Sequence, residues 1–373
     1  MPGLYIHIPF CKQACHYCNF HFSTSLRYKD EMVQALLREM EIQRGYLQGA
    51  TLGTIYLGGG TPSLLDAKDL GLLFDQIYRL FPAIANPEVT LEANPDDLTR
   101  EKVEALRKSP VNRLSIGIQS FSEEDLRFMN RAHTAGEAQD CIKRVQDAGF
   151  ENITIDLIYG SPTTSDAQWK QNLDIFFAHQ IPHLSPYCLT VEPKTALDHF
   201  VKKGTAPPVD EEKASRHFEY IMDTMAARGF EHYEISNFAL PGWHSKHNSS
   251  YWKGEPYLGI GPSAHSFNGD TRQWNVANNA QYLRALAEGR VPFEVEALTP
   301  ANRYNEYVMT SLRTQWGCDL EHIRSLPEDF SQHFLTQIQP FIDSGHAQRE
   351  GAVFRLTRSG KLIADYLAAE CFF

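Results

Sequence analysis

Residues 3 to 18 read Gly-Leu-Tyr-Ile-His-Ile-Pro-Phe-Cys-Lys-Gln-Ala-Cys-His-Tyr-Cys, a short apolar strand pattern followed by three cysteines. The three cysteines, Cys11, Cys15 and Cys18, lie within eight residues. A disulfide framework would be spread more evenly along a secreted chain, so this spacing indicates metal or redox chemistry. Three thiolates can hold three irons of a [4Fe–4S] cluster and leave the fourth iron open to another ligand.

Other interpretations of the cysteines remain open at this point. A zinc site of three cysteines and His16 or His21 is the metal alternative, although no second pair of zinc ligands follows in the chain. The third possibility is that the three cysteines have a purely structural role. The scattered cysteines are expected to be small apolar fillers of the core; they are Cys141, Cys188, Cys318 and Cys371.

The first two thirds of the chain alternate between strand and helix patterns. Short apolar, β-rich runs occur at 4–8, 54–57, 89–92, 113–118, 153–158 and 183–189. Stretches with helical periodicity lie between or after them, at 29–46, 70–80, 100–108, 135–148, 167–179 and 211–228. Six such alternations predict a parallel sheet with helices outside, either as an open doubly wound sheet or as a partial or full barrel.

The pattern changes after residue 230. Residues 232–239 read as one more strand, and an aromatic, Gly- and Asn-rich stretch that we expect to be ordered follows to residue 279. Helical patterns at 302–314, 320–324 and 334–343 precede a hairpin pattern at 347–356 and a final helix. This arrangement predicts a small winged-helix-like module at the end of the chain.

Composition and charge argue against some classes of function. Lys and Arg total 35 and Asp and Glu total 46, so the net charge is −11. This balance and the absence of a basic cluster argue against a nucleic-acid-acting protein, although the winged-helix-like tail suggests that class. No apolar run is long enough to span a bilayer, and no leader pattern precedes the first strand. We therefore expect a cytoplasmic protein that is not an integral membrane protein.

Polar residues follow the successive strands. The second strand leads into Gly58-Gly-Gly-Thr-Pro62, which alone reads as a tight turn but would also let a ligand approach the backbone. Glu92 ends the third strand, Gln119 ends the fourth with Arg131 downstream, and Asp156 lies in the fifth. Polar residues at successive strand ends face one common mouth in a barrel.

These motifs together resemble the radical S-adenosylmethionine (SAM) superfamily, and within it the anaerobic coproporphyrinogen-III oxidase family, over about residues 3 to 290. The resemblance implies that the open iron chelates SAM and that an electron from the cluster cleaves it to methionine and a 5′-deoxyadenosyl radical. Motif by motif, the resemblance also implies which residues contact SAM: Tyr5, Tyr17, Gly59, Gly60, Thr61, Glu92, Gln119, Arg131 and Asp156.

Two features separate the chain from the oxidases of that family. The oxidases carry a fourth cysteine two residues after the third, and Phe20 stands at that position. His247-Asn248-Ser-Ser-Tyr251-Trp252 fits the H-N-x-x-Y-W signature of the HemW-type haem chaperone subfamily. A neutral imidazole can be an axial ligand of haem iron, and the aromatic rings could pack against the macrocycle. The alternative is an ordered aromatic loop whose histidine bonds a backbone carbonyl.

The sequence thus predicts an α/β protein with a partial (β/α)6 radical SAM barrel, an antiparallel extension and a small C-terminal winged-helix-like helical domain. The expected division is residues 1–230 for the barrel, 231–295 for the extension with a haem-binding loop, and 296–373 for the C-terminal domain. The expected function, from the resemblance, is a haem chaperone that carries a [4Fe–4S] cluster and SAM. Haem is its cargo, and the recipient is an acceptor haemoprotein such as a membrane respiratory component. The alternative is an oxygen-independent coproporphyrinogen-III oxidase-like enzyme.

Overall fold

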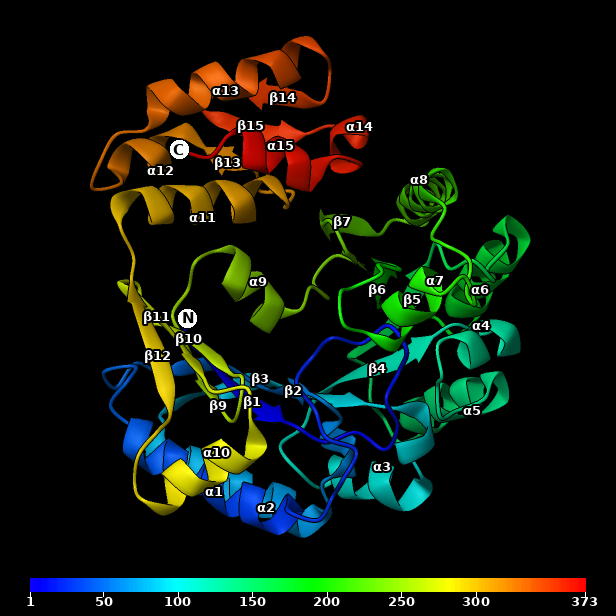
Figure 1. Ribbon diagram of the computed structural model, residues 1–373, viewed down its shortest axis with the longest axis vertical. Coiled ribbons are helices and arrows are strands. Elements are labelled where there is room, and N and C mark those ends of the chain that lie inside the picture. Colours follow the sequence, from blue (N-terminus) through cyan, green and yellow to red (C-terminus); the bar gives the residue numbers. More distant parts are fainter.

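A computed structural model describes all residues from 1 to 373, and six parallel strands form the centre of its main sheet (Figure 1). The six strands lie side by side in chain order; they are β1 (Gly3–Ile8), β2 (Leu52–Gly59), β3 (Ala83–Ala93), β4 (Arg113–Gln119), β5 (Ile153–Tyr159) and β6 (His183–Cys188). Every neighbouring pair among them is parallel. The predicted partial (β/α)6 barrel is confirmed.

Helices connect these strands and cover the outer face of the sheet. They are α1 (Lys29–Gln43), α2 (Ala67–Leu80), α3 (Arg100–Arg107), α4 (Glu123–Phe128), α5 (Ala135–Asp147), α6 (Asp166–Ala178), α7 (Ala196–Lys202) and α8 (Glu211–Ala227). Side chains such as Ile55 and Leu57 of β2 are fully buried in one apolar cluster of 54 residues. This core fixes the strands, so that the loops after them are held at defined positions.

The extension lies at both edges of the parallel sheet. Beyond β6 the chain forms an antiparallel hairpin of β8 (Asn237–Ala239) and β7 (Glu231–Glu234), so the prediction of one continuous strand over 232–239 is wrong. On the other edge β9 (Tyr257–Ile260) is parallel to β1, and the antiparallel strands follow; they are β10 (His265–Phe267), β11 (Thr271–Asn275) and β12 (Phe293–Ala297), with α10 (Asn279–Ala287) before the last.

A short helix occupies the side of the sheet opposite α1 and α2. This helix, α9 (Lys246–Trp252), is drawn in Figure 1 between the sheet and the C-terminal helices. It contains the H-N-x-x-Y-W signature, which is therefore helical and not a loop. Ser245 caps it by accepting a hydrogen bond from the Asn248 backbone N–H.

The C-terminal residues form a separate helical module with its own core of 16 buried residues. Its helices are α11 (Pro300–Leu312), α12 (Leu320–Ser325), α13 (Ser331–Asp343), α14 (Arg358–Lys361) and α15 (Ala364–Glu370). A three-stranded antiparallel sheet completes it, from β13 (Cys318–Asp319), β14 (Ala347–Glu350) and β15 (Val353–Leu356). The winged-helix-like prediction for the tail agrees with this order.

The C-terminal module packs against β7, α8 and α9. Arg358 pairs with Asp223 of α8, and the backbone N–H of Ile235 donates to the Arg313 carbonyl. The Arg313 guanidinium lies 5.7 Å from the Trp252 ring centre. The module thus contacts the β7–β8 hairpin, α8 and the end of α9. No helix is both long and apolar enough for a membrane span.

Candidate cofactor site

The cysteine loop lies directly after β1, beside the glycine loop that follows β2. The Thr61 hydroxyl donates to Cys11 Sγ at 3.4 Å, and Arg131 Nη1 donates to Cys15 Sγ at 3.3 Å. All three cysteines are free thiols with partly exposed side chains. Burial and the neighbouring Cys18 and Cys15 raise the pKa of Cys11 to about 11. The three sulfurs therefore form one group of free ligands in one loop.

The geometry favours a cluster over a single zinc ion. Neither candidate histidine points at the cysteines, because His16 Nδ1 bonds the Phe128 carbonyl at 2.8 Å and His21 Nε2 bonds Asn279 Oδ1 at 2.7 Å. No three His, Cys, Asp or Glu side chains converge on one point that could hold an ion. In a [4Fe–4S] cluster each thiolate binds its own iron, so convergence on one point is not required.

The glycine loop after β2 has no room for side chains. A Cβ on Gly59, where φ is +102°, would lie 2.5 Å from His7 Cε1, and one on Gly60 would lie 2.6 Å from the Phe10 carbonyl oxygen. A Cβ on Gly58 would approach Glu92 Oε1 to 2.9 Å. The backbone of this loop consequently packs directly against β1 and the residues after it, a close approach that only glycine allows.

Arg131 ties three strand ends together. Its Nη2 donates to Asn94 Oδ1 at 2.6 Å and to the Gly117 carbonyl at 2.7 Å, while its Nε has no partner although it is buried. Asn94 in turn donates to Thr61 Oγ1 at 3.2 Å. Asn94, which was not among the predicted site residues, therefore belongs to this network.

Gln119 and Tyr17 border the same network. Gln119 adopts φ of +66° at an irregularity in the β4–β5 pairing, which turns its side chain back over Gly117. A Cβ on Gly117 would meet Gln119 Nε2 at 2.9 Å. Burial raises the pKa of Tyr17, with opposing effects from the Arg131 cation and the Cys15 thiol close by. Gln119 thus lies at the end of β4, and Tyr17 lies in the cysteine loop near Arg131 and Cys15.

Two carboxyl groups lie on the inner face of the sheet, which is the face that the connecting helices do not cover. Glu92 accepts hydrogen bonds from the Tyr56 hydroxyl at 2.7 Å and from the Gly59 N–H at 3.1 Å, and burial raises its pKa. Burial and the charge of Glu92 raise the pKa of Asp156 to about 7. The fully buried Arg113 lies close enough to oppose both shifts. The inner face therefore carries ionisable groups beneath the strand ends.

Sequence reasoning missed several inner-face residues. Tyr187 of β6 has a pKa raised by burial and by Asp156, yet 42% of its surface is exposed, so its ring borders open space beside the carboxyl groups. Tyr56 stacks on Tyr5 with ring centres 6.0 Å apart, and the Tyr5 hydroxyl bonds His7 Nδ1 at 3.2 Å. The alternation of side chains along each strand is the signal that could have found them.

The H-N-x-x-Y-W helix contacts the sheet near the start of β2 and not at the strand ends. His247 is 1% exposed; its Nδ1 and the Thr54 hydroxyl are 2.7 Å apart, and its Nε2 and the Tyr251 hydroxyl are also 2.7 Å apart. Thr54 precedes Gly59 by five residues, which is about 16 Å along a strand. The structure therefore places His247 at a distance from the glycine loop, although its ring lies 6.5 Å from the ring of Tyr5, one of the residues expected to contact SAM. The alternative of a bond to a backbone carbonyl is also wrong for this side chain.

The environment of His247 keeps the imidazole neutral. Burial and the nearby Arg113 lower its pKa to about 3. The neutral form is the one that binds metals. Asn248 makes no side-chain hydrogen bond, and Trp252 is half-buried beneath Arg313. The four signature residues thus occupy one helix but do not form an open site.

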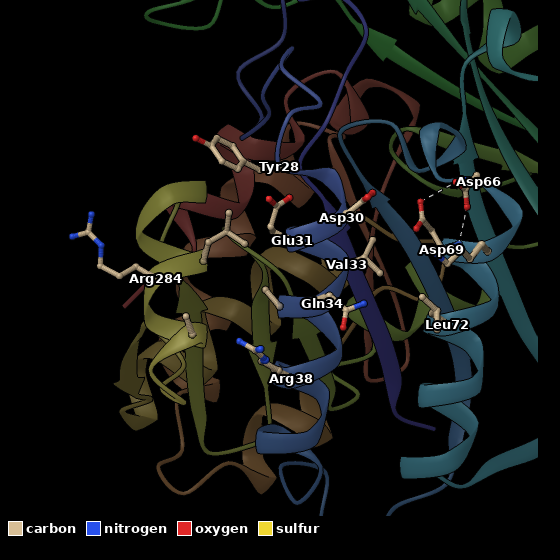
Figure 2. Close-up of a pocket in the computed structure, with 14 residues that line it drawn as sticks. Tyr28, Asp30, Glu31, Val33, Gln34, Arg38, Asp66, Asp69, Leu72 and Arg284 are labelled. Atoms are coloured by element: carbon tan, nitrogen blue, oxygen red, sulfur yellow. Dashed lines mark hydrogen bonds between the residues drawn. The ribbon is translucent and has the colours of Figure 1, made fainter.

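A groove on the outer face is separate from all of these residues. It has a volume of about 710 Å³ and lies between α1, α2 and α10. Figure 2 shows the acidic Glu31 and Asp30 and the basic Arg38 and Arg284 along it. None of the candidate cofactor or haem residues lines this groove, so it has no part in the site described above.

Comparisons with known proteins identify the superfamily and the fold. A profile of the Radical SAM superfamily matches residues 5–175, and a profile of the HemN C-terminal domain matches residues 298–363. The structure is similar to that of coproporphyrinogen III oxidase (HemN) from Escherichia coli, described as a radical SAM enzyme. The TM-score is 0.87, with 23% identity and coverage of 100% of this chain and 90% of that one. At this identity the likeness shows the fold alone.

Curated relatives are more similar in sequence. The heme chaperone HemW of Bacillus subtilis is 34% identical over 98% of this chain and 97% of its own length. The heme chaperone HemW of Lactococcus lactis is 38% identical over 85% and 83%. The protein of the same name from Escherichia coli is 38% identical over 70% and 69%.

Proposed function

The chain belongs to the HemW heme chaperone family within the radical SAM superfamily, and on this premise we propose that it binds haem and transfers it to an acceptor haemoprotein. The observation that carries the proposal is the similarity to the Bacillus subtilis chaperone over almost the whole of both chains. The H-N-x-x-Y-W helix and Phe20, which stands where the oxidases have a fourth cysteine, support the same assignment.

Membership of the superfamily implies a [4Fe–4S] cluster and SAM, and the residues present fit both groups. We propose that Cys11, Cys15 and Cys18 each bind one iron, since they are free, close together and partly exposed. When bound, the cluster supplies the electron for reductive cleavage of SAM. Thr61 and Arg131 orient the sulfurs through the hydrogen bonds described above.

The remaining strand-end residues are proposed to bind SAM. Gly59 and Gly60 carry no side chains, so their backbone groups can contact a ligand directly. Further hydrogen-bonding groups are proposed to select the polar ends of such a ligand; they are Tyr5, Tyr17, Glu92, Gln119, Arg131 and Asp156. The unpartnered Nε of Arg131 is one donor that such a ligand would satisfy.

His247 is proposed as the axial ligand of haem, with Asn248, Tyr251 and Trp252 as its neighbours in the haem-bound protein. Three other histidines compete for this role. His232 and His244 already bond other groups, the Ile235 carbonyl and Glu231 respectively. His265 is exposed, makes no side-chain hydrogen bond and stacks on Trp274 with ring centres 6.2 Å apart, so it is the strongest competitor.

The decisive experiment separates a chaperone from an oxidase. The protein is reconstituted with iron and sulfide without oxygen, and the same sample is tested for haem binding and for coproporphyrinogen-III decarboxylation. Haem binding without decarboxylation supports the proposal. Decarboxylation without haem binding selects the oxidase alternative, which shares the strand-end site.

Substitution of His247 tests the haem ligand. His247→Ala should fold and keep its cluster, because α9 lies outside the alternating strand–helix core. Loss of one iron bond should weaken haem binding by at least about 2 kcal/mol, which is roughly thirtyfold, and change the Soret band. His265→Ala is the matched control. A reversed result, with loss only in His265→Ala, would move the ligand to His265.

The acceptor and the domain division are further proposals. A membrane respiratory component is the kind of acceptor that the resemblance suggests, and a pull-down from membranes with the haem-loaded protein would identify it. We also propose that residues 1–230, 231–295 and 296–373 act as barrel, extension and C-terminal domain. The separate apolar core of residues 304–371 supports the last boundary.

A further inference from the structure

The His247 imidazole has no free coordination position. Its Nδ1 is 2.7 Å from the Thr54 hydroxyl and its Nε2 is 2.7 Å from the Tyr251 hydroxyl. Each ring nitrogen has one lone pair or one hydrogen to offer, and both are used. Iron could bind only where one of these hydroxyl groups now lies.

The surroundings of His247 also exclude a macrocycle. The Tyr56 ring stacks on one face of the imidazole with centres 4.9 Å apart and planes inclined by 25°. The Tyr251 ring meets it edge-on, also at 4.9 Å. A haem ring coordinated at Nε2 would lie across the line from this nitrogen to Tyr251. Because β1 and β2 lie directly behind His247, movement of Tyr251 alone would not make room.

Three residues of the sheet keep α9 in this position. The Glu88 carboxylate of β3 accepts hydrogen bonds from the backbone N–H groups of Lys246 at 3.0 Å and His247 at 2.9 Å. These amides are in the first turn, where no partner within the helix exists. Thr54 holds the imidazole edge, and Tyr56 covers its face. All three belong to β2 or β3, which the core fixes.

We propose that Glu88, Thr54 and Tyr56 are positioning residues that hold α9 closed on the sheet, and that His247 binds haem iron only after α9 leaves this position. The inference rests on the proposed function, because it concerns the same histidine. It adds that the present arrangement is the closed state. Haem then selects a minor open state, and the apparent dissociation constant is the intrinsic one divided by the open fraction.

Weakening the closed state should strengthen haem binding. Glu88→Gln removes the negative charge that accepts two amide hydrogen bonds but keeps the side-chain shape. Thr54→Val removes the hydroxyl and keeps the volume. Each change should raise both the haem association rate and the haem affinity by roughly tenfold, the value of one such hydrogen bond. A purely structural role would produce the opposite sign, since a damaged fold binds less haem.

The experiment is stopped-flow haem binding to the reconstituted full-length protein, followed at the Soret band. The matched control is Glu104→Gln, an exposed glutamate of α3 that pairs with Lys108 and should change neither quantity. Hydrogen–deuterium exchange of residues 246–252 provides a measurement on the unmodified protein. These amides should be protected without haem and exchange faster with haem bound.

Each outcome decides the proposal. Faster and tighter binding in both variants, with faster exchange of α9 on haem binding, supports it. Unchanged rates in both variants overturn the closed-state proposal, and so do α9 amides that stay protected with haem bound. If His247→Ala still loses haem affinity in that case, the assignment of His247 as the haem ligand stands. Haem binding that His247→Ala does not affect overturns the closed-state proposal and the His247 assignment together.

Discussion

The substitution Gly59→Ala offers a sharp test of the strand-end site, because it adds one methyl group to the glycine loop. Gly59 adopts φ of +102°, a backbone region that residues with a Cβ rarely occupy. The new Cβ would also lie 2.5 Å from His7 Cε1. His7 is buried and its Nε2 bonds the His21 carbonyl at 3.0 Å, so it can move only by losing that bond.

The expected loss of stability follows from these two effects. Strain at such a φ costs about 2 kcal/mol. Loss of the His7 hydrogen bond costs about 1 kcal/mol. The lower entropy of alanine in the unfolded chain returns about 0.5 kcal/mol. The free energy of unfolding should therefore fall by about 2 to 3 kcal/mol, and SAM should bind at least roughly tenfold more weakly because the clash with His7 must displace the glycine loop.

The assay compares urea denaturation and SAM equilibrium dialysis in the reconstituted protein, below the unfolding transition. The matched control is Gly71→Ala in α2, where a Cβ would meet no atom within 4 Å. That change should raise stability by about 0.5 to 1 kcal/mol and leave SAM affinity unchanged. Unchanged SAM affinity in Gly59→Ala would refute the role of the glycine loop as a ligand cradle.

Three further predictions concern other parts of the molecule. Replacing any of Cys11, Cys15 or Cys18 with Ser should abolish the cluster absorption, whereas Cys141→Ser should keep it; stoichiometric zinc in protein purified without oxygen would contradict this. Glu39 is buried, and burial raises its pKa to about 7. A carboxyl group with a raised pKa stabilises the fold at low pH, and this contribution is lost as the pH rises. The free energy of unfolding of the wild type should therefore fall by about 3 kcal/mol relative to that of Glu39→Gln between pH 4.5 and 8. A difference between the two proteins that does not change with pH in urea titrations would exclude this. Tyr56→Phe keeps the ring on His247 but loses the hydroxyl hydrogen bond to Glu92. Any change in haem affinity that SAM binding causes should therefore become smaller in this variant. An unchanged effect of SAM, in haem titrations with and without it, would disprove a connection of the two sites through Tyr56.

The alternating pattern of the first 230 residues predicted the central fold because each strand and helix there has a strong local signal. The α2 helix, for example, has a capping box at Asp66 and Asp69 as well as an apolar stripe. The extension lacked such signals. Residues 235 and 236 interrupt the hairpin of β7 and β8 without a Gly or Pro, so one strand was the simpler reading of that stretch.

The α9 helix could not be predicted from propensity. Its residues Lys-His-Asn-Ser-Ser-Tyr-Trp include few strong helix formers, and a seven-residue helix is unstable alone. Contacts with Glu88 and Thr54 stabilise it, and these residues lie about 160 and 190 positions earlier in the chain. A motif match could identify His247 as a candidate ligand, but only the tertiary structure shows that its nitrogens are occupied.

The inner-face residues, in contrast, could be predicted from the alternation of side chains along each strand, a pattern that the continuous apolar runs make less obvious. Ile55 and Leu57 of β2 are fully buried against the outer helices, so Thr54, Tyr56 and Gly58 must point to the opposite face. The same alternation places Glu88 and Glu92 of β3 on the inner face, and the register pairs Thr54 with Glu88. One strand pair therefore presents Thr54 and Glu88 to α9 and, about 13 Å further along, Glu92 and Gly58 to the strand-end site. Tyr56 lies between these two levels and contacts both, through its ring to His247 and its hydroxyl to Glu92. Any rearrangement of Glu92 on ligand binding thus acts on a residue that also holds α9.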